Sequence, residues 1–166
     1  SDAWANAEFA AVSQFTHVLV EAERSMFGLR FGRQLRTEIS ELQRHGVSVA
    51  FIAHGTDIRD PRAHATRTTW SPYPGDPRTA TLQSDAEANL QLLTEAQLPT
   101  FVSTPDLLDD VPWATWCPVI ADIARFITDA PLVLTRGPAR VPRIIHASSN
   151  AAQKGSDLLE PALASL

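Results

Sequence analysis

The stretch VSVAFIA, residues 47–53, runs directly into the polar sequence HGTDIRD, residues 54–60. VSVAFIA is almost continuously apolar, which is the pattern of a strand buried on both faces in a parallel sheet. Gly46 precedes it at the place where a helix commonly ends in a glycine. The stretch therefore predicts a central parallel strand between a helix and a polar loop.

The segments on either side alternate in the same way. Apolar residues recur at helical spacing in three segments, residues 2–14, 29–45 and 82–93. Two other segments, residues 16–22 and 100–104, are short and β-rich. Residues 105–111 predict a short helix that has Thr104 as its N-cap and Pro105 as its first residue. Alternating strands and helices favour right-handed βαβ crossovers. The predicted fold class is α/β, a Rossmann-like parallel sheet with flanking helices.

Composition limits the possible functions. Of the 166 residues, 44% are hydrophobic and 20% are charged, as in ordinary soluble globular proteins. The sequence lacks an apolar run of the ~18 residues that a transmembrane segment needs. A formal net charge of -5 gives no chain-wide attraction for nucleic acid, so no nucleic-acid partner is expected. The single cysteine, Cys117, excludes an internal disulfide and a multi-cysteine zinc site, and we expect a cytoplasmic protein.

Residues 129–142 have the composition of a linker, because they contain three prolines and one glycine. The next segment, RIIHA (residues 143–147), predicts a new strand that belongs to a sheet separate from the first three strands. A single strand and helix after the linker cannot bury their own faces, and the chain does not begin with Met. We therefore expect an incomplete sheet and a piece of a longer protein.

Ligands of open α/β sheets bind outside the carboxyl ends of the strands. Three polar sequences fall at such ends: HGTDIRD after Ala53, STPDLL after Val102 and SSNAAQKGS after Ala147. We expect the first three strands to lie side by side and parallel, with HGTD and STPD at the same edge of the sheet. The polar, proline-punctuated sequence that continues to Pro77 predicts a long loop with a functional role.

His54 directly follows the central strand. A histidine there can polarise or deprotonate a hydroxyl group near neutral pH, or it can be a hydrogen-bonded structural residue. A metal site formed by His54, Asp57, Asp60 and His64 is a further alternative, but the spacing fits no metal motif and Pro61 interrupts a common helical face. Serine hydrolysis is disfavoured because the sequence has no GxSxG motif.

The last polar sequence places Lys154, Gly155 and Ser156 between a predicted strand and a predicted helix. Backbone N–H groups at a helix start, an ammonium group and small hydroxyl donors together favour a phosphate. An ordinary turn with a solvated lysine is the alternative interpretation. The sequence contains neither a Walker loop nor a GxGxxG fingerprint. In the stretch WATWCPV, we interpret Cys117 as a packing residue and the two tryptophans as core or domain-joint residues.

Three motifs resemble those of GT-B glycosyltransferases of the family 4, or group 1, type. HGTDIR is similar to the HGSD-R stretch that follows a central strand in their N-terminal domain. VSTPDLLDDVPWATWCPVIAD resembles the segment that ends that domain. PRIIHASSNAAQKGSDLLEPAL resembles the opening strand, loop and helix of their C-terminal domain. The motifs stand in the family's order and span residues 47–166.

This resemblance implies two Rossmann-like domains facing a cleft, transfer of a sugar from a nucleotide-sugar donor to an acceptor with retention at the anomeric carbon, and no metal or other cofactor. Residues 1–128 would be the C-terminal part of the acceptor-side domain, residues 129–142 the linker, and residues 143–166 the start of the donor-binding domain. The implied catalytic residues are His54 and Asp57. The implied donor-binding residues are Ser149, Asn150, Lys154, Gly155 and Arg59.

The implied partners are the nucleotide sugar, an acceptor and the remainder of the parent chain. The isolated chain is expected to be inactive, because the Glu-rich donor motif of the second domain is not in its sequence. The alternative is a non-catalytic α/β module that binds a phosphate-containing ligand or a partner protein. The lack of an arginine between Ser148 and Lys154 favours this alternative, whereas the ordered set of three motifs favours the transferase.

Overall fold

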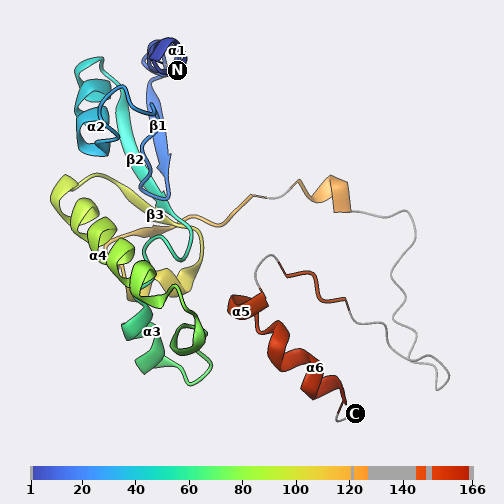
Figure 1. Ribbon diagram of the computed structural model, residues 1–166. Helices are drawn as coiled ribbons and strands as arrows, with labels where there is room; N and C mark the ends of the chain where they lie inside the picture. The colour runs from blue at the N-terminus through green and yellow to red at the C-terminus, as the bar shows by residue number, and fades with distance from the viewer. Residues whose placement is uncertain (1, 121, 127–144, 149–150, 165–166) are drawn as a thin grey trace. The chain divides into compact units, whose positions relative to one another are not determined.

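The computed structural model describes residues 2–120, 122–126, 145–148 and 151–164. The chain divides into two units, Ser1–Pro118 and Val119–Leu166. The first unit contains a four-stranded parallel sheet with helices beside it, so the predicted α/β class is confirmed (Figure 1). The predicted linker, residues 129–142, lies outside the described residues. Among the helices that are described, none combines the length and the apolar character needed to cross a membrane.

The strands lie in the order β1-β2-β3-β4, and each neighbouring pair is parallel. Their bounds are β1 His17–Glu21, β2 Ser48–Ala53, β3 Thr100–Val102 and β4 Thr115–Trp116. Phe51 is paired with Val20 on one side and with Thr100 on the other. The predicted parallel neighbours β1, β2 and β3 are therefore confirmed. The two residues of β4 were not predicted, because so short a strand has no readable period.

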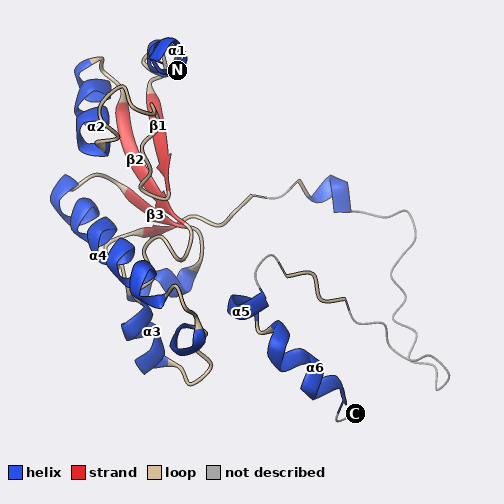
Figure 2. Ribbon diagram, in the orientation of Figure 1, coloured by secondary structure: helices blue, strands red, loops and turns tan. Residues whose placement is uncertain are grey.

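The helices of the first unit precede or connect these strands (Figure 2). They are α1 Asp2–Val12, α2 Leu35–Arg44, α3 Pro61–Arg67 and α4 Thr79–Ala96, with the 3-10 turns η1 Tyr73–Gly75 and η2 Pro105–Asp109. The second unit contains η3 Ile123–Phe126, α5 Ala151–Lys154 and α6 Ser156–Ala164.

Helices α2 and α4 cover one face of the sheet, on the left in Figure 1. Val20, Phe51 and Val102 are fully buried there, in one cluster with Leu42 of α2 and Leu93 of α4. The other face is open in part, because Leu19 of β1 is 50% exposed. Cover on both faces, which the apolar pattern predicts for β2, therefore does not extend to β1. Right-handed crossovers between strands that follow one another in sequence order place every connecting helix on the same face.

The predicted helix over residues 29–45 begins only at Leu35. Gly32 and Arg33 have left-handed φ angles of 60° and 59°, which a right-handed helix does not allow. Phe31 instead packs edge-on against Phe9 and Phe27. Its helical spacing from Leu35 reflects burial in this aromatic cluster and not membership of the helix.

The predicted long loop after β2 contains helix α3. Pro61 occupies its first turn, and the Asp60 side chain accepts a hydrogen bond of 2.8 Å from the backbone N–H of Ala63. The predicted short helix after β3 is the 3-10 turn η2, and Thr104 forms no side-chain cap there. Seven residues of α3 carry too few apolar positions to show a helical period.

The second unit has no strand at Ile145–Ser148, so the predicted RIIHA strand is wrong for its described residues; Arg143 and Ile144 lie outside the description. A single strand without a partner leaves its backbone groups unpaired, which accounts for the extended loop. Helix α6 contains Pro161, which removes one internal hydrogen bond. Ile145 and Leu158 are exposed.

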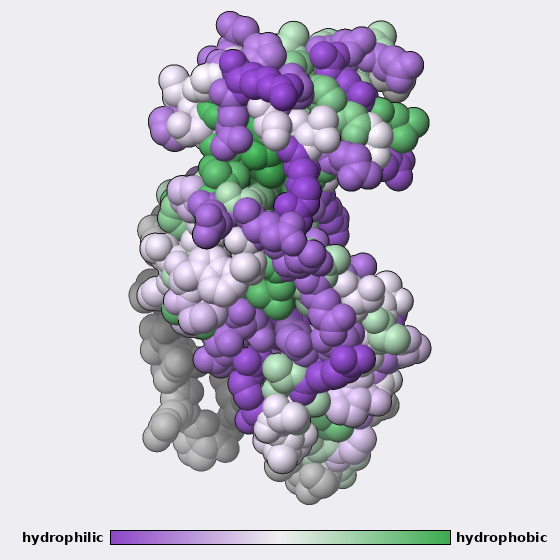
Figure 3. Space-filling model, turned by 90° about the vertical axis from the view of Figure 1, so that its left-hand side faces the viewer, coloured by the Kyte–Doolittle hydropathy of each residue, from purple (hydrophilic) through white to green (hydrophobic). Residues whose placement is uncertain are grey.

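The side of the molecule that carries α2 and α4 is predominantly hydrophilic, with hydrophobic surface in a limited band (Figure 3). A shallow groove between the two helices contains Ile39, Leu92 and Leu98. The hydrophobic faces of α2 and α4 therefore pack against the sheet, and the faces of these helices that meet the solvent are mainly polar.

Replacing Gln97 by glycine should stabilise the first unit by about 0.5–1 kcal/mol. Gln97 ends α4 with φ of 50°, and its backbone N–H bonds to the Leu93 carbonyl. Glycine adopts this left-handed conformation without steric cost. Urea denaturation followed by tryptophan fluorescence measures the change. The control Ser84→Gly, in the interior of α4, should instead destabilise by about 0.5 kcal/mol; a loss of stability in Gln97→Gly would contradict the expectation.

Candidate functional site

A pocket of about 670 Å³ opens at the carboxyl ends of β1 and β2. Residues 21–24 after β1 and residues 54–57 after β2 form two of its walls. The third wall comes from α4, which contributes Leu82, Asp85, Ala88 and Asn89. The predicted ligand edge of the sheet thus carries a pocket, and it is built around the first and second strands.

The loop after β2 is closed by its own aspartate. The carboxylate of Asp57 accepts hydrogen bonds from the backbone N–H of His54 at 2.8 Å and of Gly55 at 2.5 Å. Asn89 of α4 donates to the Asp57 carbonyl at 2.7 Å, and the next residue, Ile58, is fully buried. Asp57 therefore holds the shape of the loop that presents His54.

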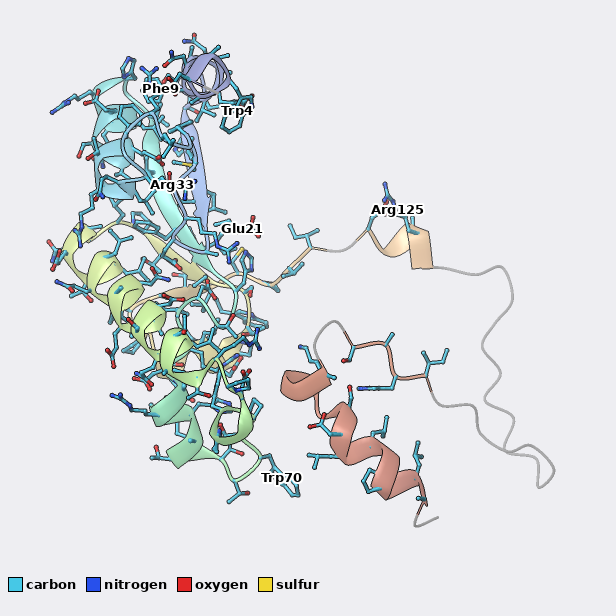
Figure 4. All side chains as sticks on the ribbon, in the orientation of Figure 1. Trp4, Phe9, Glu21, Arg33, Trp70 and Arg125 are labelled. Carbon is cyan, nitrogen blue, oxygen red and sulfur yellow. The ribbon has the colours of Figure 1, made fainter. Side chains whose placement is uncertain are left out.

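His54 lies at the rim of the pocket with its side chain 34% exposed. Its Nε2 atom is 3.1 Å from Oε1 of Glu21, the last residue of β1. Glu21 projects from the end of this strand in Figure 4. A carboxylate in this position orients the imidazole ring, and an oriented histidine at the rim of a pocket can accept a proton from a hydroxyl group.

Glu23, like Glu21, is a residue of the pocket that sequence reasoning missed. It is only 7% exposed, and in the described part of the chain neither of its carboxyl oxygens has a hydrogen-bond partner. Burial, followed by the charge of Asp57, raises the pKa of Glu23 to about 8. Glu23 is therefore a protonated acid at neutral pH, with an O–H group at the pocket wall.

The backbone at this position is strained. Ala22 and Glu23 both have φ of 53°, the left-handed conformation that costs a residue with a side chain on the order of 1 kcal/mol or more. Such strain persists where the surrounding structure fixes it, and it is common at functional sites. The available sequence signal was the polar run EAER at the end of the first predicted strand, which meets the HGTD loop at the same sheet edge.

Arg59 lies behind the pocket and does not line it. Its guanidinium forms an ion pair with Asp106 of η2, which joins the loop after β2 to the loop after β3. Burial alone would lower the pKa of Arg59, but the hydrogen bond and charge of Asp106 raise it above its ordinary value. Arg59 therefore links two loops at the carboxyl edge of the sheet through its ion pair with Asp106.

The four residues considered for a metal site, His54, Asp57, Asp60 and His64, have different partners and do not form one cluster. Asp57 and Asp60 both accept backbone hydrogen bonds, in the loop and at the start of α3. His64 forms a hydrogen bond of 2.9 Å between Nδ1 and Oγ of Ser71, and its ring packs edge-on against Tyr73. Within the residues that the structure describes, no group of three or more His, Cys, Asp or Glu side chains could hold a metal ion.

Lys154 and Gly155 lie in the second unit, at the junction of α5 and α6. Lys154 is exposed at the end of α5, and Gly155 has φ of 68°, which breaks the helix before Ser156. The Ser156 hydroxyl lies 3.1 Å from that of Ser148 and 2.8 Å from Nε2 of His146. Ser149 and Asn150 are outside the described residues. The described half of this loop brings hydroxyl groups together at the start of α6.

The aromatic residues near the end of the sheet are not core residues. Trp113 and Trp116 are each 52% exposed, so the core interpretation is wrong. Trp116 belongs to the edge strand β4, which leaves half of its ring uncovered. Cys117 is half-buried and its backbone N–H continues the pairing to Val102. Trp70, 83% exposed, lies beyond α3 and far from Glu21 in Figure 4.

Comparison of the chain with protein-family models, with curated proteins and with solved structures finds no match. A function for the site can therefore be inferred from its geometry and from the sequence motifs.

Proposed function

We propose that the chain belongs to a glycosyltransferase of the GT-B type, which transfers a sugar from a nucleotide-sugar donor to a hydroxyl group of an acceptor with retention of configuration. The first unit binds the acceptor in the pocket at the ends of β1 and β2. The second unit contacts the donor diphosphate through Lys154 and Gly155. The observation that carries this proposal is the His54–Glu21 pair at the rim of that pocket.

The lining of the pocket suits a hydroxylated ligand. His54 and the loop closed by the Asp57 carboxylate face it from one side, and Asn89 and Asp85 face it from α4. Carboxylates, imidazole and amide groups each bind sugar hydroxyls by accepting or donating hydrogen bonds. In the proposed reaction, His54 accepts a hydrogen bond from the reacting hydroxyl group, and Glu21 orients the imidazole ring for this contact.

The negative charge of the pocket supports the proposal that the first unit binds the acceptor and the second unit binds the donor. Glu21, Asp57 and Asp85 are carboxylates that would repel a diphosphate. The second unit instead offers the exposed ammonium group of Lys154 and the hydroxyl groups at the start of α6. A phosphate-binding module without catalysis would use only this second set of groups.

The proposal predicts two ligands with separate footprints on the ¹⁵N-labelled chain. A panel of nucleoside diphosphates should shift the amide signals of Gly155 and Ser156, and neutral polyols such as scyllo-inositol should shift those of residues 54–57. Lys154→Ala should weaken diphosphate binding about tenfold to a hundredfold, because it removes a charge-assisted contact. His54→Ala should leave that affinity unchanged and weaken polyol binding. Binding is the direct readout, since we expect no turnover from the isolated chain.

Each variant is the control for the other. Diphosphate footprints at residues 54–57, or polyol footprints at Gly155, would contradict the assignment of the two units. Binding of diphosphate with no response of the pocket to any polyol would favour the non-catalytic phosphate-binding module.

A further inference from the structure

The pocket at the ends of β1 and β2 is acidic beyond what hydroxyl binding requires. Glu21, Asp57 and Asp85 contribute carboxylates from three different elements, and Arg24 is the one arginine or lysine among the lining residues. Asp85 is exposed on α4, and among the described residues no hydrogen bond or ion pair engages its carboxylate. The surface that meets a ligand therefore carries an excess of negative charge.

Glu23 adds a second, independent observation. Its side chain lines the pocket, it is more than nine-tenths buried, and neither carboxyl oxygen has a hydrogen-bond partner in the described chain. Burial of a polar group without a hydrogen-bond partner costs free energy. A ligand that donates a hydrogen bond to Glu23 recovers this free energy when it binds. The carboxyl oxygens of Glu23 can accept a hydrogen bond from a ligand, and a positively charged donor suits them best because it also favours the carboxylate form.

The kind of cation follows from the spacing of the acidic groups. No set of three or more possible ligands in the described residues could hold one metal ion, so the charges are too dispersed for metal coordination. A pocket of about 670 Å³ accommodates a small organic molecule. Its hydroxyl groups would meet His54 and Asn89, and its ammonium groups would meet the carboxylates.

Building on the proposed function, we infer that the acceptor is an amino sugar or an aminocyclitol, whose ammonium group binds at Glu23 and Asp57 while Asp85 adds negative charge to the same pocket. The groups facing this position are Glu21 of β1, Arg24 of the following loop, His54 and Asp57 of the loop after β2, and Asp85 of α4. Four of the five are acids or a histidine, and Arg24 is exposed at the rim.

Binding should be coupled to loss of a proton. Burial and the charge of Asp57 keep Glu23 protonated in the empty pocket. An ammonium group within about 4–6 Å favours the carboxylate and lowers its pKa. Binding of the cation therefore releases a proton from Glu23 into the buffer, which a neutral sugar does not cause.

The test uses streptamine, which is scyllo-inositol with two hydroxyl groups replaced by amino groups. Titration of the ¹⁵N-labelled chain near pH 6.5 should show streptamine binding at least about tenfold more tightly than scyllo-inositol at residues 54–57, and the advantage should shrink at high salt. Asp85→Asn should reduce the advantage several-fold, because it removes a negative charge that attracts only the ammonium ligand. Glu8→Gln on α1, outside the pocket, should leave both affinities unchanged.

Calorimetry of streptamine binding in HEPES and in phosphate buffer measures the released proton. The wild-type chain should release up to about one proton per ligand, and Glu23→Gln should abolish this release while the pocket keeps its shape. Equal affinity for the two probes, or unchanged proton release in Glu23→Gln, would overturn the inference and leave the proposed function standing. Failure of both probes to bind would overturn the proposed function itself.

Discussion

Replacing Glu23 by glutamine is expected to remove a large pH-dependent loss of stability from the first unit. The pKa of Glu23 is about 8 in the folded chain, against 4.5 for an unperturbed glutamate. Between these values the folded state holds a proton that the unfolded state has lost. The free energy of unfolding contributed by Glu23 is therefore full below about pH 4.5 and falls as the pH rises to about 8, with a limiting slope of about 1.4 kcal/mol per pH unit.

Between about pH 4.5 and pH 8, the free energy of unfolding falls by a total on the order of 3–5 kcal/mol because of Glu23, which is a large part of the stability of a small domain. Glutamine has the same shape and cannot ionise, so the difference between wild type and Glu23→Gln isolates this group from all others that titrate. The variant should match the wild type near pH 4.5 and exceed it increasingly up to about pH 8.

Urea denaturation at a series of pH values measures this difference, and tryptophan fluorescence follows the first unit alone. All four tryptophans, at positions 4, 70, 113 and 116, belong to Ser1–Pro118. Glu8→Gln, on the exposed surface of α1, is the matched control and should leave the pH profile of the wild type unchanged. Parallel profiles for wild type and Glu23→Gln would show that Glu23 ionises normally.

Strands β1, β2 and β3 were predictable because each has a local cause in the sequence. VSVAFIA is apolar at successive positions, and its residue Phe51 is fully buried between two parallel neighbours. The same is true of α4, whose leucines follow a helical period over many residues. These signals need no knowledge of distant parts of the chain.

The elements that were missed depend on single residues or on distant partners. Helix α3 is defined by the Asp60 cap and by Pro61 in its first turn, which a search for apolar periodicity passes over. The late start of α2 depends on left-handed angles at Gly32 and Arg33. In a sequence, a glycine can indicate a left-handed φ angle, but an arginine such as Arg33 gives no such indication.

The candidate site shows the same division. His54 and Asp57 were found because they follow a recognisable strand, and the rule for parallel sheets places such residues at the ligand edge. Glu21 and Glu23 meet them there only because β1 pairs with β2 in the register that joins Val20 to Phe51. Register is a property of the folded sheet, so the carboxyl groups that set the charge of the pocket could not be assigned from residue types alone.

Glu38 carries the largest expected effect of a single side chain on folding. It lies in α2, is completely buried, and accepts hydrogen bonds from Oγ of Ser25 at 2.6 Å and from the backbone N–H of Met26 at 2.8 Å and of Phe27 at 3.3 Å. These donors belong to the loop that follows Glu23. One carboxylate thus fixes the course of the chain between the pocket and α2.

Glu38→Ala should destabilise the first unit by about 3–5 kcal/mol, because it leaves buried N–H groups without an acceptor and opens a cavity in the core. Glu38→Gln, which keeps one acceptor oxygen, should cost about half as much. Glu41→Ala on the same helix removes a surface pair with Arg44 and should cost less than about 1 kcal/mol. Urea denaturation followed by tryptophan fluorescence ranks the three variants. Because the loop from residue 24 to residue 34 loses its anchor, hydrogen exchange of its amides should accelerate before that of β2. Uniform acceleration in both segments would mean that Glu38 stabilises the core as a whole and does not position the pocket wall at Glu23.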